Sequence, residues 1–320
     1  MPYKKSILDI SIVIVNYKSW NHLRNCLQSL EFSNPSFTYE TIVVDNTSND
    51  DKLENFKKEF SNVKFILNSG NNGFANGCNL GANHSLGEYL LFLNPDTIAN
   101  QESILKMWQF AQKNPKVGIT SCLQKKVNGE YEKSHRSFLK LSTAFGIFRA
   151  FSKKNTVEDA SVIYTDWVSG SLVFISKEWL DQVNGWNEDY WMYFEDMDLS
   201  KKVQIANGKV VVLRDAHIIH NHGGASRINI KTASLTKIEV QISKHVYIQN
   251  HLKGFERFLT HLLVIKSNLF FKFILAVIGI LLFFIPKMRL NVYLFIKIAK
   301  YYVSSVTRRT WLSKNSMNAH

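Results

Sequence analysis

Short apolar runs alternate with amphipathic helical patterns over the first two-thirds of the chain. Residues 10–16, ISIVIVN, have the composition of a strand buried on both faces, and Trp20, Leu23 and Leu27 follow at helical spacing. The same pair of patterns recurs over residues 40–60, where a strand ETIVVD precedes a second helix. The first part of the chain therefore predicts repeated strand–helix units.

The alternation continues to residue 220. Further strands are predicted for NVKFIL at 62–67, LLFL at 90–93, VGITS at 117–121, DWVSGSLVFIS at 166–176 and KVVVLRDAHIIH at 209–220. Helices are predicted over 101–113 and from about Glu195 to Asn207-Gly208. Strands that alternate with helices form parallel sheets covered on both faces, so the prediction is an α/β fold with an open, mostly parallel twisted sheet. Ligands of such sheets bind at the carboxyl ends of the strands.

Residues 123–165 interrupt this alternation. They are more polar and less regular than the rest of the body, and Asn128-Gly129 has the composition of a hairpin turn. We interpret the segment as a flap or a flexible insert.

The C-terminal region differs from the body in both charge and hydropathy. Residues 241–320 contain twelve lysines and arginines and one acid, Glu256, so they carry +11 of the +13 of the whole chain. They also contain FILAVIGILLFFI, residues 273–285, which has no charge. Nucleic-acid-binding tails are basic but rarely so apolar, whereas an anionic membrane surface matches both features. The sequence predicts a nearly neutral globular body at 1–240 and a helical, membrane-associating tail at 241–320.

The length of the apolar stretch favours one mode of membrane attachment. As a helix, residues 273–285 would extend about 20 Å, which is less than the ~30 Å hydrocarbon core of a bilayer. Lys266, Lys272, Lys287 and Arg289 flank the stretch. We therefore expect helices that lie in the membrane interface rather than a spanning helix.

The cysteine pattern and the N-terminus suggest a reducing compartment. Cys26, Cys78 and Cys122 form no CxxC pair, which predicts neither a disulfide framework nor a zinc ribbon. No charged-then-apolar leader precedes the first predicted strand, so we expect no signal peptide.

Polar residues follow three of the predicted strands: Asn16, Asp45 and Asp96. Each could be the N-cap of the next helix, because Asn and Asp are favoured there. Three of them at one edge of a sheet would instead make a polar binding site. The first strand has no GxGxxG after it, which argues against dinucleotide binding, and the chain has no GxxxxGK[ST] loop and no GxSxG elbow.

Three other segments contain candidate chemistry. NSGNNGFANGCNLG, residues 68–81, is either a flexible loop leading into a closely packed helix or a set of backbone amides that face a phosphate or sugar. WMYFEDMDLSKK, residues 191–202, combines Glu195, Asp196 and Asp198 with aromatic residues. A helix dipole stabilises acids in the first turn, but aromatic rings beside carboxylates are also a common sugar-binding arrangement.

Three histidines lie close together in the segment AHIIHNHGG, residues 216–224: His217, His220 and His222. Two of them could bind one metal ion, but a zinc site needs further ligands that the cysteines are not spaced to supply. We expect His217 to be structural, whereas His220 is as well explained by a metal or phosphate role as by a structural one.

Taken together, these segments resemble the family 2 glycosyltransferases, and within them the bacterial rhamnosyltransferase-like branch. The matching segments, in the same order over about residues 10–226, are SIVIVNY, IVVDNTS, NNGFANGCNLG, LFLNPDT, the stretch from WVSGSLVFIS to GKVVVL, and HNHGGAS. The resemblance implies the GT-A fold, a nucleotide-sugar-binding α/β domain.

The resemblance also implies roles for individual residues. Asp96 stands at the last acid of the DxD motif that binds a divalent cation, Mg²⁺ or Mn²⁺, and His220 matches a histidine that also binds it in some members. Asp196 matches the catalytic base, with Glu195 in a supporting role. The predicted donor-binding residues are Asn16, Asp45, Gly73, Asn79, Asn94 and Asp96, of which Asn94 replaces the first acid of the motif. The predicted acceptor-binding residues are Trp167, Gly170, Trp191 and Tyr193.

The implied function is an inverting glycosyltransferase that uses a nucleoside diphosphate sugar, by resemblance dTDP-L-rhamnose. Its acceptor would be a lipid-linked saccharide at the cytoplasmic face of a bacterial plasma membrane, in the synthesis of O-antigen or capsule polysaccharide. The alternatives are a UDP-hexose transferase of the same fold and a catalytically inactive, membrane-bound module that binds sugar nucleotides. No nucleic-acid partner is expected, and the sequence predicts neither the linkage nor the oligomeric state.

Overall fold

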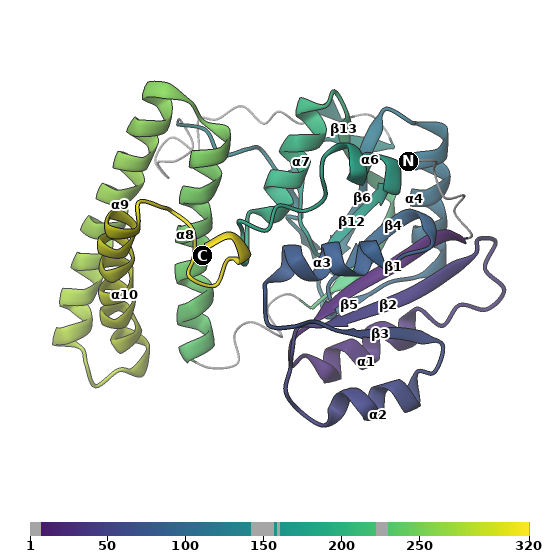
Figure 1. Cartoon of the computed structure of the whole chain (residues 1–320), viewed down its shortest axis with the longest axis horizontal. Helices are drawn as coiled ribbons and strands as arrows, with labels where there is room; N and C mark the ends of the chain where they lie inside the picture. Colours follow the sequence, from purple (N-terminus) through teal and green to yellow (C-terminus); the bar gives the residue numbers. More distant parts are fainter. Residues whose placement is uncertain (1–7, 142–156, 159–160, 222–229, 320) are drawn as a thin grey trace. The chain divides into compact units, whose positions relative to one another are not determined.

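The computed structural model describes residues 8–141, 157–158, 161–221 and 230–319 (Figure 1). The chain divides into two compact units. The first consists of residues 1–138, 154–188 and 195–225, and the second consists of residues 139–153, 189–194 and 226–320. The first unit is built from strands and helices in alternation, and long helices dominate the second.

The elements of the first unit follow the predicted alternation closely. In chain order they are β1 (Leu8–Asn16), α1 (Trp20–Ser29), β2 (Tyr39–Asp45), α2 (Lys52–Glu59), β3 (Val63–Leu67), α3 (Phe74–Asn83), β4 (Gly87–Leu93), β5 (Thr97–Ile98), α4 (Gln101–Lys113), β6 (Val117–Lys125), β7 (Tyr131–Glu132), β8 (His135–Arg136), β9 (Val157–Glu158), β10 (Val162–Tyr164), β11 (Trp167–Val168), β12 (Leu172–Ser176), α6 (Lys177–Gln182), α7 (Glu195–Ile205) and β13 (Lys209–His220). The stretch predicted as one strand at 166–176 is divided into β11 and β12 by a short loop.

One sheet runs through the first unit, and across the described residues its order is β3-β2-β1-β4-β12-β6-β13-β10-β9. β1 pairs in parallel with β2 and β4, and β6 pairs in parallel with β13. β12 lies antiparallel between β4 and β6. The predicted open, mostly parallel sheet is therefore confirmed, with antiparallel strands added to it. The parallel order brings the carboxyl ends of β1, β2 and β4 to one edge.

Helices cover both faces of this sheet, as predicted. Alternate side chains of β1 point to opposite faces, as strand geometry requires. Ile12 and Ile14 belong to the hydrophobic cluster that includes α1 and α4, whereas Val13 and Val15 belong to the cluster that includes α3 and α7. The sheet edge that holds the candidate site is thus supported by two buried layers.

Helix α3 packs directly on the sheet through its glycines. A Cβ atom at Gly81 would lie 2.3 Å from Cγ1 of Val13, and one at Gly77 would lie 2.7 Å from Cγ1 of Val15. Gly73, which precedes the helix, has φ +94°, a conformation that glycine adopts without steric cost. The glycine-rich run at 68–81 therefore includes the closely packed helix that was one of its two interpretations.

The predicted turn at Asn128-Gly129 is confirmed. β6 and β7 pair antiparallel, with Gln124 opposite Glu132, and Gly129 has φ +85°. This hairpin brings an acidic residue from the polar insert back to the sheet. The remainder of the insert includes residues 142–156, which lie outside the described residues.

The second unit contains α8 (Ile230–His251), α9 (Gly254–Leu281), α10 (Pro286–Arg308) and a 3₁₀ turn (Met317–Ala319). α9 and α10 form an antiparallel hairpin, side by side in Figure 1. The ring centroids of Phe273 and Phe295 lie 5.6 Å apart, and a Cβ atom at Gly279 would lie 2.5 Å from the carbonyl oxygen of Met288. Residue 240, the predicted boundary, lies within α8, and as a division of function that boundary stays a prediction.

The exposed surface of the hairpin is strongly apolar. Among the described helices, α9 alone is long and apolar enough to cross a membrane by length and composition. Large apolar side chains are exposed along its second half and in the following turn: Phe270, Phe271, Phe273, Ile274, Leu275, Val277, Ile278, Ile280, Leu281, Phe283, Phe284 and Ile285. Large contiguous apolar patches on a protein surface commonly mark interaction sites.

Candidate functional site

The polar residues at the ends of β1 and β2 are joined to each other. Nδ2 of Asn16 donates a hydrogen bond to Oδ1 of Asp45 at 3.0 Å, and both side chains are buried. Asn16 Oδ1 accepts from the backbone N–H of Ser19, and Asp45 Oδ2 accepts from that of Ser48. The N-caps of the next helices are Ser19 and Asp51, so the N-cap interpretation of Asn16 and Asp45 is wrong. Their side chains instead fix the turns at the sheet edge.

A chain of asparagines extends from this edge along α3. Asn68 donates to both Asn46 and Asn76, whose own amide donates to Glu188 at 2.9 Å. Asn79, a predicted donor-binding residue, donates to the same carboxylate at 2.7 Å and exchanges two hydrogen bonds with the backbone of Trp186. The network holds residues 186–188 against α3. Glu188 could not be predicted from the sequence, because its partners Asn76 and Asn79 lie over 100 positions away.

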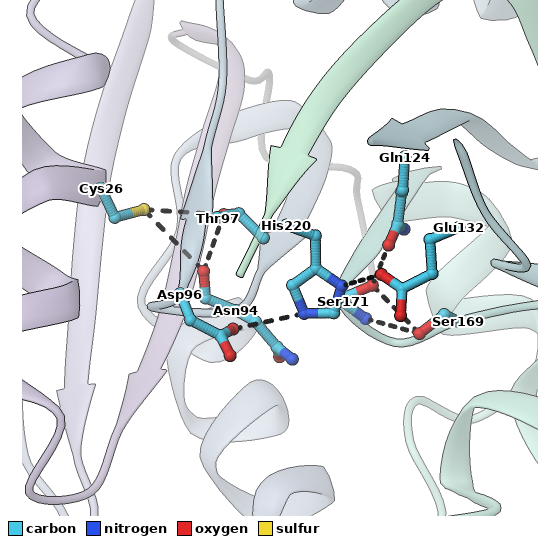
Figure 2. A network of polar contacts seen from close by, with 9 residues as sticks. All are labelled: Cys26, Asn94, Asp96, Thr97, Gln124, Glu132, Ser169, Ser171 and His220. Carbon is cyan, nitrogen blue, oxygen red and sulfur yellow. Dashed lines mark hydrogen bonds and ion pairs between the residues drawn. The ribbon is translucent and has the colours of Figure 1, made fainter. Parts of the chain in front are cut away.

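Asp96 and His220, the predicted metal ligands, lie side by side because two strands pair. β5 pairs antiparallel with β13, which places Thr97 opposite His220, and the N–H of Asn221 donates to the carbonyl oxygen of Asp96 at 2.9 Å. His220 Nε2 lies 3.4 Å from Asp96 Oδ1, and both side chains are buried (Figure 2). A predicted acid and a predicted histidine, more than 120 positions apart, therefore form one pair.

His220 has a second acidic neighbour, which the sequence did not predict. Oε2 of Glu132, at the end of the β6–β7 hairpin, lies 3.0 Å from His220 Nδ1, so the imidazole stands between two carboxylates (Figure 2). Burial lowers the pKa of His220, but the hydrogen bonds and negative charges of Asp96 and Glu132 outweigh burial and raise it above its ordinary value. The Asn-Gly turn was the sequence signal that could have pointed to Glu132.

The chemistry of Asp96 and His220 fits a divalent cation that a phosphate would help to bind. No group of three His, Cys, Asp or Glu side chains in the described ranges could hold a metal ion by itself. Mg²⁺ is usually bound by one or two carboxylates together with substrate phosphates, and imidazole also suits transition metals. Asp96 and His220 would supply one oxygen and one nitrogen donor to a site of this kind.

The other two histidines of the segment do not extend this pair. The side chain of His217 is exposed, and its backbone is hydrogen-bonded to Ser103 and Asn100 beside α4, which agrees with the expected structural role. His222 lies outside the described residues.

The acids at the start of α7 have different surroundings. Asp196 is half-buried, and its Oδ2 and Oδ1 accept hydrogen bonds from the backbone N–H groups of Gly170 and Met197 at 2.9 and 2.8 Å. Glu195 is buried, and its Oε2 has no hydrogen-bond partner in the described structure. Burial raises the pKa of both carboxyls, most strongly that of Glu195, where the charge of Asp196 adds to the effect. Asp196 is the more accessible of the two.

A short loop between β11 and β12 connects the two groups of acids. The N–H of Gly170 holds Asp196, while the carbonyl oxygen of Ser171 accepts from the N–H of Asn94, two residues before Asp96. The hydroxyl of Ser171 donates to Gln124, at the base of the hairpin that carries Glu132. Residues 169–171 thus fix the Asp96 turn, the hairpin and Asp196 relative to one another.

The predicted acceptor-binding residues fall in both units. Trp167, in β11, donates from its indole N–H to the carbonyl of Ser137 at 3.1 Å, and Gly170 follows in the connecting loop. Trp191 is buried and Tyr193 has φ +71°, and both lie in the segment 189–194 of the second unit, where Ser243 of α8 donates to the carbonyl of Met192. Acceptor binding by these four residues stays a prediction.

Several curated proteins are similar to this chain over most of its length. A hexosyltransferase of low-salt glycan biosynthesis, Agl10 of Haloferax volcanii, is 27% identical over 67% of each chain. The rhamnosyltransferase WbbL of Escherichia coli K12 is 24% identical over 66% of this chain and 83% of its own. An N-acetylglucosaminyl-diphospho-decaprenol L-rhamnosyltransferase of Mycobacterium tuberculosis is 24% identical over 66% of this chain and 76% of its own.

The architecture matches solved structures as well. The structure of GalNAc-T7 with UDP, GalNAc and Mn²⁺ superposes with a TM-score of 0.55 over 75% of this chain and 50% of that one, at 18% sequence identity, which supports the expected GT-A fold. The model of Glycosyl transferase family 2 matches residues 11–176, just over half of the chain and most of the elements described above. The chain therefore belongs to glycosyl transferase family 2.

Proposed function

We propose that this protein is an inverting glycosyltransferase that moves one sugar from a nucleoside diphosphate donor to a lipid-linked saccharide. The observation that carries the proposal is the loop 169–171, which holds Asp196 through Gly170 and the Asp96 turn through Ser171. A single displacement needs a base on the acceptor side of the sugar and charge stabilisation on the leaving-group side. This loop supports one candidate group for each side.

Asp196 is the proposed base. The acceptor hydroxyl attacks the anomeric carbon as the bond to the diphosphate breaks, and a base must take the hydroxyl proton as the new bond forms. Asp196 is partly accessible, and two backbone N–H groups orient its carboxylate. Glu195, buried beside it, is the proposed supporting residue. The aromatic residues Trp191 and Tyr193, with Trp167, are proposed to bind the acceptor.

Asp96 and His220 would hold Mg²⁺ or Mn²⁺. A bound divalent cation would neutralise the negative charge that develops on the departing diphosphate. Asn94 begins the same turn, and its N–H is held by Ser171. The turns that Asn16 and Asp45 fix are proposed to bind the base and ribose, and Gly73 and Asn79 the rest of the donor, at the same edge of the sheet.

The donor is proposed to be dTDP-L-rhamnose. Two relatives from bacteria are named rhamnosyltransferases, one of them acting on a decaprenol-linked saccharide by its name. The relative from Haloferax volcanii is named a hexosyltransferase, which keeps a UDP-hexose donor as the second candidate. The proposed pathway is the synthesis of a cell-surface polysaccharide of the O-antigen or capsule type.

A lipid-linked acceptor would place the enzyme at a membrane, and the hairpin α9–α10 is proposed to attach it there. Its exposed apolar residues would enter the interface of the cytoplasmic leaflet, and Arg289, Lys297 and Lys300, exposed on α10, would meet anionic headgroups. α10 returns antiparallel along α9 with these charges, so the hairpin suits an interfacial position better than a span.

The test is a panel of radiolabelled donors, incubated with the full-length enzyme and a bacterial membrane extract. Transfer of label from dTDP-rhamnose to a lipid-extractable product is expected, and the anomeric configuration of the product should be inverted. Transfer only from a UDP-hexose would replace the donor assignment. Donor binding without transfer from any donor would instead identify an inactive binding module.

A further inference from the structure

We propose that Glu132 is a positioning residue that orients His220 for binding the cation. Glu132 would accept a hydrogen bond from Nδ1–H of His220, so that Nε2 presents its lone pair beside Asp96. The inference rests on the proposed function, because it concerns the site proposed to hold Mg²⁺ or Mn²⁺. It adds a residue that neither the sequence motifs nor the match to the family model assigns to that site.

The geometry on the two sides of the imidazole supports this assignment. Oε2 of Glu132 lies 3.0 Å from Nδ1, whereas Oδ1 of Asp96 lies 3.4 Å from Nε2 (Figure 2). An ionised carboxylate only accepts hydrogen bonds, so the shorter contact favours the tautomer that carries the proton on Nδ1. In the neutral ring the lone pair then lies on Nε2, the nitrogen that faces Asp96.

Burial indicates that Glu132 has a specific task. Its side chain is 17% exposed, whereas that of Glu130, two residues earlier in the same hairpin, is 63% exposed and pairs with Lys126. Removing a carboxylate from water is costly unless it is hydrogen-bonded or paired. Glu132 therefore lies in the costlier of two neighbouring environments, and its contact with His220 is one that it makes there.

The surrounding strands fix this contact. Glu132 stands opposite Gln124 in the β6–β7 ladder, and Gln124 accepts from Ser171 of the loop that also holds Asn94. Metal-bound histidines commonly donate their other N–H to a carboxylate, and loss of that partner typically weakens metal binding 10–100-fold. The β6–β7 hairpin thus places Glu132 beside His220 as a carboxylate partner of the kind that metal-bound histidines use.

The proposal is tested by titrating the full-length protein with MnCl₂, with and without inorganic phosphate, and measuring free Mn²⁺ by electron paramagnetic resonance. Glu132→Ala should weaken Mn²⁺ binding by about 10–100-fold, and Glu132→Gln, which retains an acceptor oxygen and the side-chain shape, should weaken it less. Glu130→Ala is the matched control from the same hairpin and should leave the affinity unchanged.

A double-mutant cycle separates positioning from a general effect on charge or fold. If Glu132 acts through His220, Glu132→Ala should cause little further loss of affinity in a His220→Ala background. Equal losses in both backgrounds, unchanged affinity in Glu132→Ala, or a wild type that does not bind Mn²⁺ would each overturn the inference. The assay needs no donor or acceptor, so its failure is distinct from absence of transfer in the donor panel.

Discussion

At the scale of single residues, Asp196 and Glu195 are adjacent in sequence but differ in accessibility. Asp196 is half-buried with both carboxylate oxygens held by backbone N–H groups, whereas Glu195 is buried. We predict that Asp196→Asn lowers kcat by about 10²–10⁴-fold, the usual cost of losing a general base. The KM for the donor should change little, because the base acts on the acceptor hydroxyl. Steady-state kinetics with varied donor would measure both.

Glu195→Gln is the matched control for that experiment. It alters the neighbouring carboxylate and leaves the backbone hydrogen bonds to Asp196 in place, so a smaller loss of kcat is expected. A near-normal kcat in Asp196→Asn together with collapse in Glu195→Gln would assign the base to Glu195 instead.

Asp96 leads to a prediction about metal dependence. Asp96→Asn retains the shape of the side chain but removes the negative charge, so transfer should fall by roughly 10²-fold or more, as when an electrostatic stabiliser is lost. EDTA should inhibit the wild type, and added Mn²⁺ or Mg²⁺ should restore it. The melting temperature of the variant should stay close to that of the wild type. Full wild-type activity in EDTA would remove the metal from the mechanism.

The sequence predicted part of this site because strand ends can be recognised locally. Asn16 and Asp45 follow apolar strand patterns, and parallel pairing of neighbouring strands then places them together, as the 3.0 Å contact confirms. Glu132 and Ser171 could not be found in this way. Their positions depend on a two-residue strand and on an antiparallel strand, and runs of apolar residues do not reveal strand direction.

At the scale of elements, the packing of α3 on β1 leads to a stability prediction. A methyl group at Gly81 would lie 2.3 Å from Val13, so Gly81→Ala forces the helix or the strand to move. Overpacking of this kind typically costs about 1–3 kcal/mol. Chemical denaturation should show a lower midpoint with an unchanged slope. Asn83→Ala, at an exposed position of the same helix, is the control and should have little effect.

The helices and strands themselves were well predicted where periodicity was strong. α4 covers the predicted residues 101–113, and α7 begins at Glu195. The interruption between β11 and β12 was not foreseen, because the residues VSGS look like a continuous strand in sequence. The backbone of this loop makes long-range contacts that the local pattern does not reveal, since it donates to Asp196 and accepts from Asn94.

At the scale of the whole molecule, charge and apolar surface are concentrated in the second unit. We predict that the full-length protein binds vesicles containing anionic lipid, and that the double substitution Phe283→Ser and Phe284→Ser weakens this binding. The two rings are 67% and 66% exposed between α9 and α10, so their loss should not disturb the fold. Each ring removed from the membrane interface makes the free energy of binding less favourable by about 25 cal/mol for every Å² of apolar surface that would have been buried.

Leu67→Ser is the matched control, because Leu67 is 61% exposed in the first unit and lies outside the basic region. Vesicle flotation would measure binding in all three proteins. Equal binding by the wild type and the double variant would contradict attachment through the α9–α10 hairpin. Release by high salt or carbonate would favour the interface over a span.

Because Gly170 donates a hydrogen bond to Asp196, the protonation state of Asp196 can be followed by nuclear magnetic resonance in the absence of substrate. Glycine amides occupy a sparsely populated region of a nitrogen–proton spectrum, and the resonance of an amide that donates to a carboxylate moves when that carboxylate ionises. The Gly170 peak should therefore follow the protonation of the proposed base without any substrate present. The protein carries its own reporter of the proton that catalysis would move.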